Sequence, residues 1–285
     1  MTGRLALPLL LLGAAALLVS GRAAEPGSGT LNHGTPSWEA VQPGLELGTL
    51  PVSAPGEGRW TKVVLLRMDP ARVRLGLDIR LSPDFSAGAW AVDSAPPEAV
   101  AAFNAGQFKG IAPWGWTVMD GLELRPPGTG PLSLAVVGDT AGRIRFVEPD
   151  SIEIVRRAGG TRIALQSYPA LLTGRGSIPR QLTEPGLGVG IGHRDSRLAL
   201  CQLPDRRLLL LLTRFDGLGD AGGAIPLGLT LGETARLLKD QGCLRAVALD
   251  GGISSQLLLR DPAGGTRAWR AWRKVPLGVT VSIAP

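Results

Sequence analysis

The chain has 285 residues, of which 44% are hydrophobic and 19% are charged, so it can bury the core of one large domain or of two small ones. The formal net charge is +6, but the basic residues are scattered and mostly arginine. Because there is no dense basic run and little aromatic interleaving, the composition does not indicate a nucleic-acid-binding protein. The 40 glycines and 23 prolines imply many turns, which favours a strand-rich fold over a helical bundle.

The first 23 residues have the pattern of a secretory signal peptide. Arg4 gives a positive start, residues 5–19 form an apolar stretch that is short for a membrane span, and residues 21–23 offer small side chains for cleavage. An uncleaved signal anchor is the alternative. We therefore expect an exported protein, periplasmic or secreted, with no stable membrane span after cleavage. Loss of Arg4 and Arg22 would leave a net charge of 6 − 2 = +4.

Residues 24–37 are rich in Gly, Ser and Thr and are predicted to be a linker, which leaves residues 38–285 as one folded domain. Short apolar or alternating runs between turn signals predict the strands of this domain. In chain order these regions are 45–47, 63–66, 72–77, 99–103, 115–119, 122–125, 134–137, 143–147, 162–165, 197–201, 207–213 and 269–283. Regions 63–66 and 72–77 are predicted to pair as a hairpin, and Asp120-Gly121 is a strong signal for another.

A capped helix is predicted after residue 230. Thr230 and Glu233 have the spacing of a capping box, and apolar side chains follow at helical spacing. Gly242 is placed to end this helix in a left-handed conformation. The next apolar run, residues 246–249, predicts a buried strand.

That strand ends in Asp250-Gly251-Gly252, with the hydroxyl of Ser254 just beyond. At the end of a strand a carboxylate leaves the core and can meet a ligand, and the glycines allow a close approach to the backbone. A tight turn in which Asp caps the next N–H groups is the alternative. The residues alone leave both interpretations open.

Cysteine and histidine are scarce. Cys201 and Cys243 match no zinc pattern, and they either pair in an oxidising compartment or remain as two buried thiols. His33 and His193 are the only histidines, so a zinc site built on several histidines is excluded. His193 lies in a polar loop and is interpreted as a solvated residue.

The order of the motifs is more specific than any one of them. Asn-x-Gly-x-Phe begins at Asn104 after a strand, and Gln166 stands at another strand end. Arg-x-Ala begins at Arg197, and a Gly-Leu-Thr-Leu-x-Glu helix leads to Leu-Asp-Gly-Gly-x-Ser-Ser around Asp250. From Trp38 to the carboxyl end, this series resembles the phosphodiester glycosidase family.

The resemblance implies an α+β fold, a single domain with a large strand-rich mixed sheet core and a few packed helices. It also implies hydrolysis of a sugar-1-phosphodiester at the sugar carbon. No cofactor is expected, and no residue is assigned as a metal ligand. Departures from the family pattern at Ala105, Gln107, Tyr168-Pro169, Leu198 and Cys201 bear on the substrate more than on the fold.

The resemblance also implies roles for particular residues. Asp250 is the candidate base or nucleophile, Asn104 is a second catalytic candidate, and Arg197 is expected to hold the phosphate and to favour ionised Asp250. The other predicted substrate-binding residues are Gln166, Gly106, Phe108, Gly251, Gly252 and Ser254.

Because they stand at strand ends, Asn104, Gln166, Arg197 and Asp250 are predicted to converge on one pocket. A second carboxylate is unassigned among Glu184, Asp216 and Asp220, and Trp114 or Trp116 is a candidate to stack on a sugar ring, although a core role is favoured for both. The expected partner is a phosphorylated glycan. A non-catalytic glycan-binding or envelope scaffolding protein is the alternative function.

Overall fold

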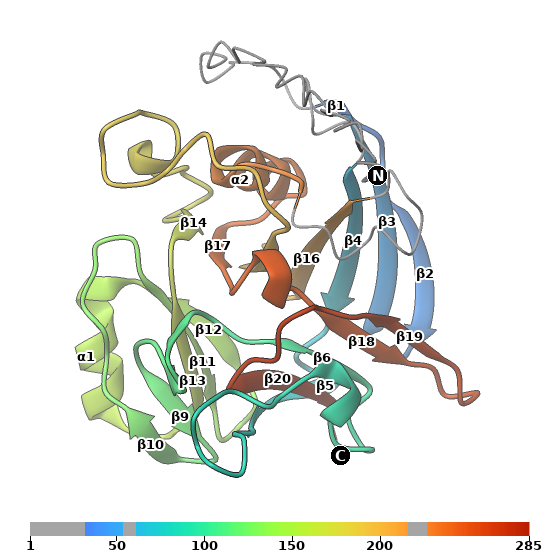
Figure 1. Ribbon diagram of the computed structural model, residues 1–285, viewed down its shortest axis with the longest axis vertical. Coiled ribbons are helices and arrows are strands. Elements are labelled where there is room, and N and C mark those ends of the chain that lie inside the picture. Colours follow the sequence, from blue (N-terminus) through green and yellow to red (C-terminus); the bar gives the residue numbers. More distant parts are fainter. Residues whose placement is uncertain (1–31, 54–60, 216–226, 285) are drawn as a thin grey trace, which may run out of the picture.

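The computed structural model describes residues 32–53, 61–215 and 227–284. Within these ranges, three antiparallel sheets surround one apolar core, and two α-helices pack on the outside (Figure 1). The predicted signal peptide lies outside the described residues. The last residues of the predicted linker belong to the sheets, since Asn32 and His33 pair with Ser53 and Val52.

The large sheet contains the predicted strand that leads into the Asp-Gly-Gly loop, whereas the strand after the loop lies in another sheet. In order of pairing it holds β1 (Asn32–His33), β3 (Leu45–Ser53), β4 (Thr61–Met68), β16 (Leu208–Phe215), β15 (Leu198–Gln202), β17 (Arg245–Ala248) and β14 (Ala170–Leu172), with β2 (Ser37–Gln42) also paired to β3.

Two smaller sheets complete the core. The middle sheet holds β10 (Leu122–Arg125), β9 (Thr117–Met119), β13 (Thr161–Ser167), β11 (Leu134–Asp139) and β12 (Ile144–Val147). The carboxyl-terminal sheet holds β19 (Thr266–Trp269), β18 (Leu257–Arg260), β6 (Ala101–Asn104), β20 (Leu277–Ile283) and β5 (Val73–Ile79). A short ribbon pairs β7 (Phe108–Lys109) with β8 (Ala112–Pro113).

The large sheet is buried on both faces, which explains the unbroken leucine run of β16. Leu208, Leu210 and Leu212 point into the central core shared with the other two sheets, whereas Leu209 and Leu211 point into a second core on the opposite face. Side chains alternate between the faces of a strand, so a strand covered on both sides is apolar at every position.

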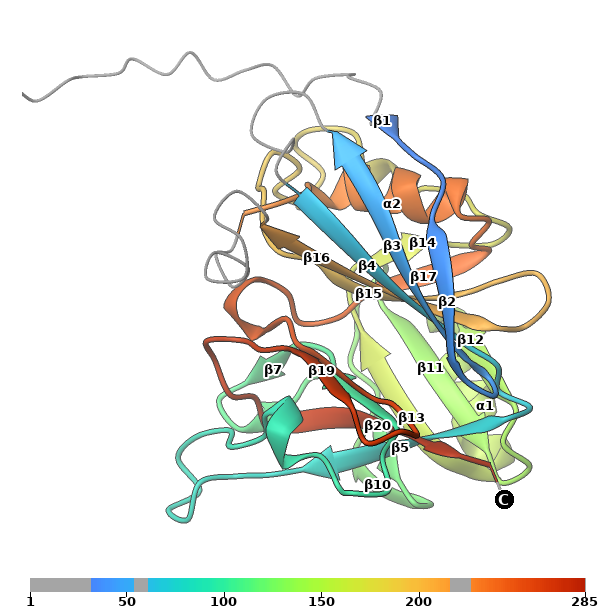
Figure 2. The same ribbon diagram turned by 90° about the vertical axis from the view of Figure 1, so that its right-hand side faces the viewer.

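Helix α2 (Leu231–Asp240) covers that second face (Figures 1 and 2). The predicted capping box is confirmed, because Thr230 Oγ1 accepts from the backbone N–H of Glu233 at 3.2 Å and the Glu233 carboxylate accepts from that of Thr230 at 2.9 Å. The helix ends as predicted at Gly242, whose φ is +85°. The N–H groups of Gly242 and Cys243 bond back to Lys239 and Leu238, which is a Schellman motif.

Helix α1 (Pro149–Ala158) was not expected from the sequence. It covers the outer face of the middle sheet and buries Ile152 among residues of that sheet. Pro149 stands at the start of the helix, where its missing N–H and fixed φ do no harm. This proline and the two glycines after Ala158 are the signals that could have found the helix.

The α+β fold class is confirmed. The sheets are not mixed as predicted, because every ladder between described strands is antiparallel. The Asp120-Gly121 hairpin is also confirmed, since both residues have positive φ between β9 and β10. The predicted hairpin of 63–66 with 72–77 is wrong. Strand β4 is apolar on both faces and is therefore an interior strand between β3 and β16, whereas β5 pairs with β20 in another sheet.

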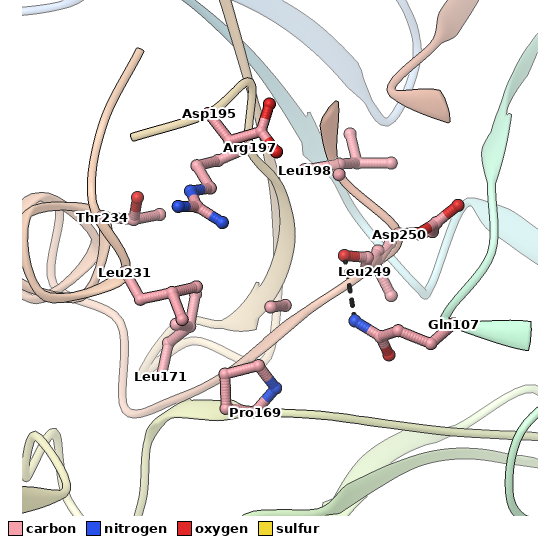
Figure 3. Close-up of a pocket in the computed structure, with 12 residues that line it drawn as sticks. Gln107, Pro169, Leu171, Asp195, Arg197, Leu198, Leu231, Thr234, Leu249 and Asp250 are labelled. Carbon is pink, nitrogen blue, oxygen red and sulfur yellow. Dashed lines mark hydrogen bonds between the residues drawn. The ribbon is translucent and has the colours of Figure 1, made fainter. Parts of the chain in front are cut away.

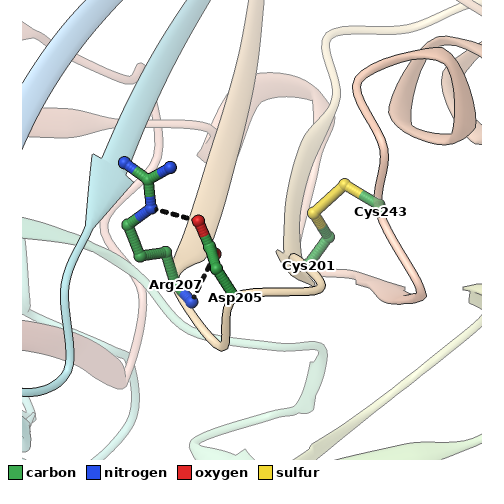
Figure 4. The surroundings of a disulfide bond; sticks show 4 residues. All are labelled: Cys201, Asp205, Arg207 and Cys243. Atoms are coloured by element: carbon green, nitrogen blue, oxygen red, sulfur yellow. Dashed lines mark hydrogen bonds and ion pairs between the residues drawn. A yellow bond between two sulfur atoms is a disulfide. The ribbon is translucent and has the colours of Figure 1, made fainter.

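Cys201 and Cys243 form a disulfide bond that joins the end of β15 to the turn after α2 (Figure 4). Their Cα atoms are 5.9 Å apart, within the usual range. Of the two alternatives that the sequence left open, the structure therefore contains the pair. None of the described helices has the length and apolar character needed to cross a bilayer.

Candidate functional site

The Asp250 loop and the Arg197 segment meet at one edge of the large sheet. Strands β15 and β17 run antiparallel, with Ala199 opposite Ala248, so the start of β15 lies beside the end of β17. Two backbone hydrogen bonds extend this pairing, from Leu249 N to Leu198 O and from Gly252 N to Ser196 O, both at 2.8 Å. The sequence prediction that Arg197 and Asp250 share a pocket is confirmed.

This pocket is a cleft of about 200 Å³. Figure 3 shows Asp195 and Arg197 on one side of it and Gln107 and Asp250 on the other. Its remaining lining residues are mostly apolar and come from four segments: Pro169, Leu171, Leu198, Leu231, Thr234, Ala248, Leu249 and Gly251. A concave site with few convergent polar groups is typical of small-molecule binding.

Gly251 and Gly252 allow the Arg197 segment to lie directly against the loop. A Cβ atom on Gly251 would stand 2.8 Å from the Ser196 carbonyl oxygen. One on Gly252, whose φ is +59°, would stand 2.9 Å from Asp195 Oδ2. The close approach that the sequence predicted at these glycines is thus made by the protein's own chain on this side.

Asn104, at the end of β6, is fully buried and does not line the cleft. Its Nδ2 donates to the Asp250 carbonyl oxygen at 2.8 Å, and its Oδ1 accepts from Gln256 N at 2.9 Å. The side chain therefore fixes both ends of the Asp250 loop.

Gln166 is fully buried in the middle sheet, also away from the cleft. Its Oε1 accepts from the N–H groups of Trp116 and Gly128, both at 2.8 Å. Its Nε2 donates to Gly128 O at 2.9 Å and to Ser133 Oγ at 3.0 Å. The predicted convergence of four residues thus holds for two of them, because Asn104 and Gln166 are committed to internal hydrogen bonds.

Gln107 is the cleft residue of the Asn-x-Gly-x-Phe motif, and the sequence did not identify it as such. Its Nε2 donates to Leu249 O at 3.4 Å, and its Oε1 accepts from Tyr168 N at 3.2 Å (Figure 3). Neighbouring Gly106 packs against Ser167, since a Cβ atom there would lie 2.7 Å from Ser167 Oγ.

Phe108 lies beside residues 272–273, which were predicted to belong to the strand region 269–283 but lie between β19 and β20 in the structure. The Arg273 guanidinium stands 4.7 Å from the centre of the Phe108 ring. The backbone N–H groups of Trp272 and Arg273 both donate to Ile253 O at 3.0 Å, which docks this segment on the Asp250 loop. The Trp272 side chain is 65% exposed. The aromatic and cationic run before β20 was the available signal.

Asp250 is an uncommon carboxylate because Oδ2 is buried and accepts no hydrogen bond from a described residue. Burial raises the pKa of Asp250 above its ordinary value, and the charge of Asp195 raises it further. The Ser254 hydroxyl and the positive charge of Arg273 lower the pKa by less. The expectation that Arg197 keeps Asp250 ionised is therefore wrong: the carboxylate points away from Arg197 (Figure 3), and the cation that acts on it is Arg273.

Arg197 is held by backbone carbonyl groups. Its Nε donates to Leu229 O at 2.8 Å and its Nη2 to His193 O at 2.6 Å. Burial lowers the pKa of Arg197, while the charges of Asp195 and Glu233 act in the opposite direction. No described residue accepts a hydrogen bond from Nη1, so this nitrogen is available to a ligand in the cleft.

Asp195 is the second carboxylate of the site. Its Oδ1 accepts from Ser196 N at 2.8 Å, and its Oδ2 lies 3.4 Å from Nε2 of the exposed His193. Of the residues that the sequence proposed, Glu184 pairs with Arg180 on a surface turn and does not line the cleft. Asp216 and Asp220 lie outside the described residues.

The tryptophans proposed to stack on sugar do not line the cleft. Trp116 is buried and donates from Nε1 to Glu123 at 3.0 Å. Trp114 packs edge-on against Tyr168, with 4.7 Å between the ring centres. Among the described residues there is no cluster of three or more His, Cys, Asp and Glu side chains that could hold a metal ion.

A sequence profile of the phosphodiester glycosidases matches residues 97–282, which contain every cleft residue named above. The chain belongs to the phosphodiester glycosidase family. No curated protein matches it.

Two solved structures share the fold. The catalytic domain of zebrafish N-acetylglucosamine-1-phosphodiester alpha-N-acetylglucosaminidase, auto-inhibited by its pro-peptide, is 17% identical with a TM-score of 0.60, over 88% of this chain and 83% of that one. A hypothetical protein from Synechocystis is 15% identical with a TM-score of 0.53, over 88% of this chain and 64% of that one. At these identities the likeness is one of fold.

Proposed function

We propose that this family member is an exported hydrolase that cleaves the glycosidic C–O bond of a sugar-1-phosphodiester in a glycan or glycoconjugate. The observation that carries the proposal is the buried carboxylate of Asp250, with an unpartnered oxygen and a raised pKa, beside a cleft that also contains Asp195 and Arg197. Perturbed carboxylates in a cleft are typical of catalytic sites.

The chemistry requires a carboxylate at the anomeric carbon. Asp250 takes this role, either as the base that receives a proton from the attacking water or as the nucleophile. A raised pKa suits a base, because proton transfer is most efficient when the pKa of the base approaches the working pH. The C–O bond to the phosphate breaks, its electron pair leaves on the phosphate oxygen, and the products are the sugar and a phosphomonoester.

The second carboxylate, Asp195, and two arginines assist the cleavage. The negative charge of Asp195 stabilises the positive charge that develops on the sugar ring in an oxocarbenium-like transition state. Arg197 binds the phosphate through Nη1, and Arg273 faces the same loop from the Phe108 side. Asn104 acts by positioning the Asp250 loop, since its amide contacts backbone groups at both ends of that loop.

The remaining predicted binding residues are given roles near this carboxylate. Ser254 is buried four residues after Asp250, and its hydroxyl lowers the pKa of the Asp250 carboxyl. Gly251 and Gly252 keep the backbone close to Asp195, and Gly106 and Gln166 support the wall that carries Gln107 and Phe108. Exposed Trp272 replaces Trp114 and Trp116 as the candidate for stacking on the sugar.

The test is release of free sugar from a sugar-1-phosphodiester by purified protein. Wild type and an Asp150→Asn control, changed at an exposed position of α1, should release sugar at equal rates. An Asp250→Asn protein should release little. Binding of the substrate by wild type without any release would instead support the alternative, a glycan-binding or scaffolding protein on this fold.

Export is tested separately by mass spectrometry of the protein recovered from the secreted or periplasmic fraction. The proposal expects a mature chain that starts after residue 23. A chain beginning at Met1 or Thr2 would show that the signal is not cleaved.

A further inference from the structure

A second cavity, of about 700 Å³, lies at the opposite end of β15 from the cleft. The cleft is lined by Arg197 and Leu198 at the start of this strand, and the second cavity by Gln202 at its end. A strand rises about 3.4 Å per residue, so these ends are roughly 14 Å apart. No residue lines both cavities, and the second one is therefore a separate feature of the surface.

Three turns form the walls of this cavity, and each contains an aspartate that is neutralised within its own turn. Asp139 accepts from Arg143 N at 2.9 Å and from Arg143 Nε at 2.8 Å. Asp205 accepts from Arg207 N at 3.1 Å and from Arg207 Nε at 2.7 Å (Figure 4). Asp69 accepts from Ala71 N at 2.9 Å and lies 3.8 Å from Arg72.

Three further arginines line the cavity, Arg74, Arg145 and Arg206, and none of them makes an ion pair with any residue that the structure describes. Since the aspartates are already paired, the cavity carries an excess of positive charge. We call it the arginine groove.

Arg74 is held in the wall of this groove by contacts with two neighbouring turns. Its Nη1 donates to Pro70 O at 3.2 Å. Its guanidinium lies against Gly142, where a Cβ atom would clash with Arg74 Cζ. Gly142 has a φ of +81°, so both its conformation and the space that it leaves favour glycine. The neighbouring turn therefore makes room for this cation.

We infer that the arginine groove binds phosphate groups of an anionic glycan, at a site separate from the cleft. Guanidinium groups bind phosphate by paired hydrogen bonds, and a concave surface of one charge attracts such ligands from a distance. The choice of a glycan rests on the proposed function, whereas the choice of phosphate rests on the arginines alone. Free phosphate compounds share this chemistry, and the test distinguishes them.

The experiment measures binding by calorimetry to two probes, inorganic pyrophosphate and a phosphodiester-linked oligosaccharide. The protein carries Asp250→Asn so that the oligosaccharide stays intact. The test variant adds Arg145→Ala and Arg206→Ala, both exposed, and a charge-retaining variant adds Arg145→Lys and Arg206→Lys. The matched control adds Arg175→Ala, an exposed arginine outside the groove that makes no ion pair with a described residue.

The Asp250→Asn protein with its groove arginines unchanged should bind the oligosaccharide more tightly than it binds pyrophosphate. The double alanine change should weaken binding of the oligosaccharide by about tenfold or more. The double lysine change should weaken it by less, because charge is kept and the planar fork is lost. An affinity that the alanine changes leave unaltered, or that falls equally in the Arg175→Ala control, would overturn the inference. Binding of pyrophosphate without the oligosaccharide would overturn the assignment to a glycan.

Different results would refute the assignment of the arginine groove and the proposed hydrolase function. With Asp250 restored, a small sugar-1-phosphodiester that reaches only the cleft should be hydrolysed equally by the protein with and without the double alanine change. A wild-type protein that binds the oligosaccharide through the groove but releases no sugar would refute the hydrolase and leave the groove assignment intact.

Discussion

The ends of β17 and β13 look alike in the sequence, each an apolar run followed by a polar side chain, but they differ in how much of their hydrogen-bonding capacity is used. Gln166 in β13 has all its partners within the protein, two donors and two acceptors. Asp250 beyond β17 has a buried oxygen with no partner among the described residues.

This difference separates a residue that holds the fold from one that is prepared for a ligand. A buried polar group that is fully hydrogen-bonded stabilises its surroundings, and its loss leaves several partners unsatisfied. A buried charge with an unpartnered atom costs free energy in the folded state and persists where function requires it. Asp250 and Gln166 should therefore respond to substitution in opposite ways.

The largest expected effect is on turnover in Asp250→Asn. This change keeps the shape of the side chain and removes its charge, so the rate of sugar release should fall by roughly 100- to 10,000-fold. The free energy of unfolding should not fall, because no internal hydrogen bond of Oδ2 is lost. Near-normal release by this variant would mean that Asp250 only shapes the turn, and Asp195 would then be the next candidate.

Gln166→Ala is expected to lower the stability of the protein and to leave substrate binding almost unchanged. The change leaves the N–H groups of Trp116 and Gly128 without their acceptor inside the protein, and each buried group left unpaired costs about 1–3 kcal/mol. The free energy of unfolding, measured in urea, should fall by about 3 kcal/mol or more, with KM for substrate little changed in the protein that remains folded.

The control for that variant is Gln181→Ala in the turn η3 (Arg180–Leu182). The Gln181 side chain is half-buried and makes no hydrogen bond to a described residue, so its loss should have almost no effect on unfolding. If Gln166→Ala were as stable as this control and raised KM instead, Gln166 would be a binding residue, as the sequence first suggested.

A smaller effect is expected for Arg197→Lys. Lysine keeps the charge but cannot reproduce the bonds from Nε to Leu229 O and from Nη2 to His193 O that aim the guanidinium into the cleft. KM should rise by about tenfold while kcat changes little, since one charge-assisted hydrogen bond contributes about 1.5–3 kcal/mol. An Arg175→Lys control on the surface should leave both constants unchanged. A fall in kcat alone would place Arg197 in the bond-breaking step.

The sequence predicted those parts of the site that depend on local pattern. The capping box of α2, its glycine stop and the strand that leads to Asp250 are all encoded by short-range spacing. The pairing of β15 with β17 brings Arg197 to Asp250, and each strand was visible as an apolar run.

What the sequence could not supply is which way each polar side chain turns. Asn104, Gln107 and Gln166 carry the same kind of amide and all bond to segments far away in the sequence, but the first and last are fully buried and only Gln107 lines the cleft. Which of them is buried depends on long-range packing. Asp195 was missed for the same reason, since its closeness to Gly252 arises from the packing of two loops. The pairing of β5 with β20 instead of β4 is also a long-range choice.

The smallest expected effect is the pH dependence of stability at Asp250. Its carboxyl group has a folded-state pKa above the ordinary value of 3.8, so the folded state binds a proton more tightly than the unfolded state does. Its contribution to stability is complete below pH 3.8 and is lost as the pH rises through the folded-state pKa.

Asp250→Asn, which cannot ionise, should therefore be more stable than wild type at pH 7. This advantage should shrink as the pH falls and vanish near pH 3.5, in urea unfolding at each pH. A wild type more stable than Asp250→Asn at pH 7 would mean that the Asp250 carboxylate is better satisfied in the folded protein than burial and an unpartnered oxygen imply.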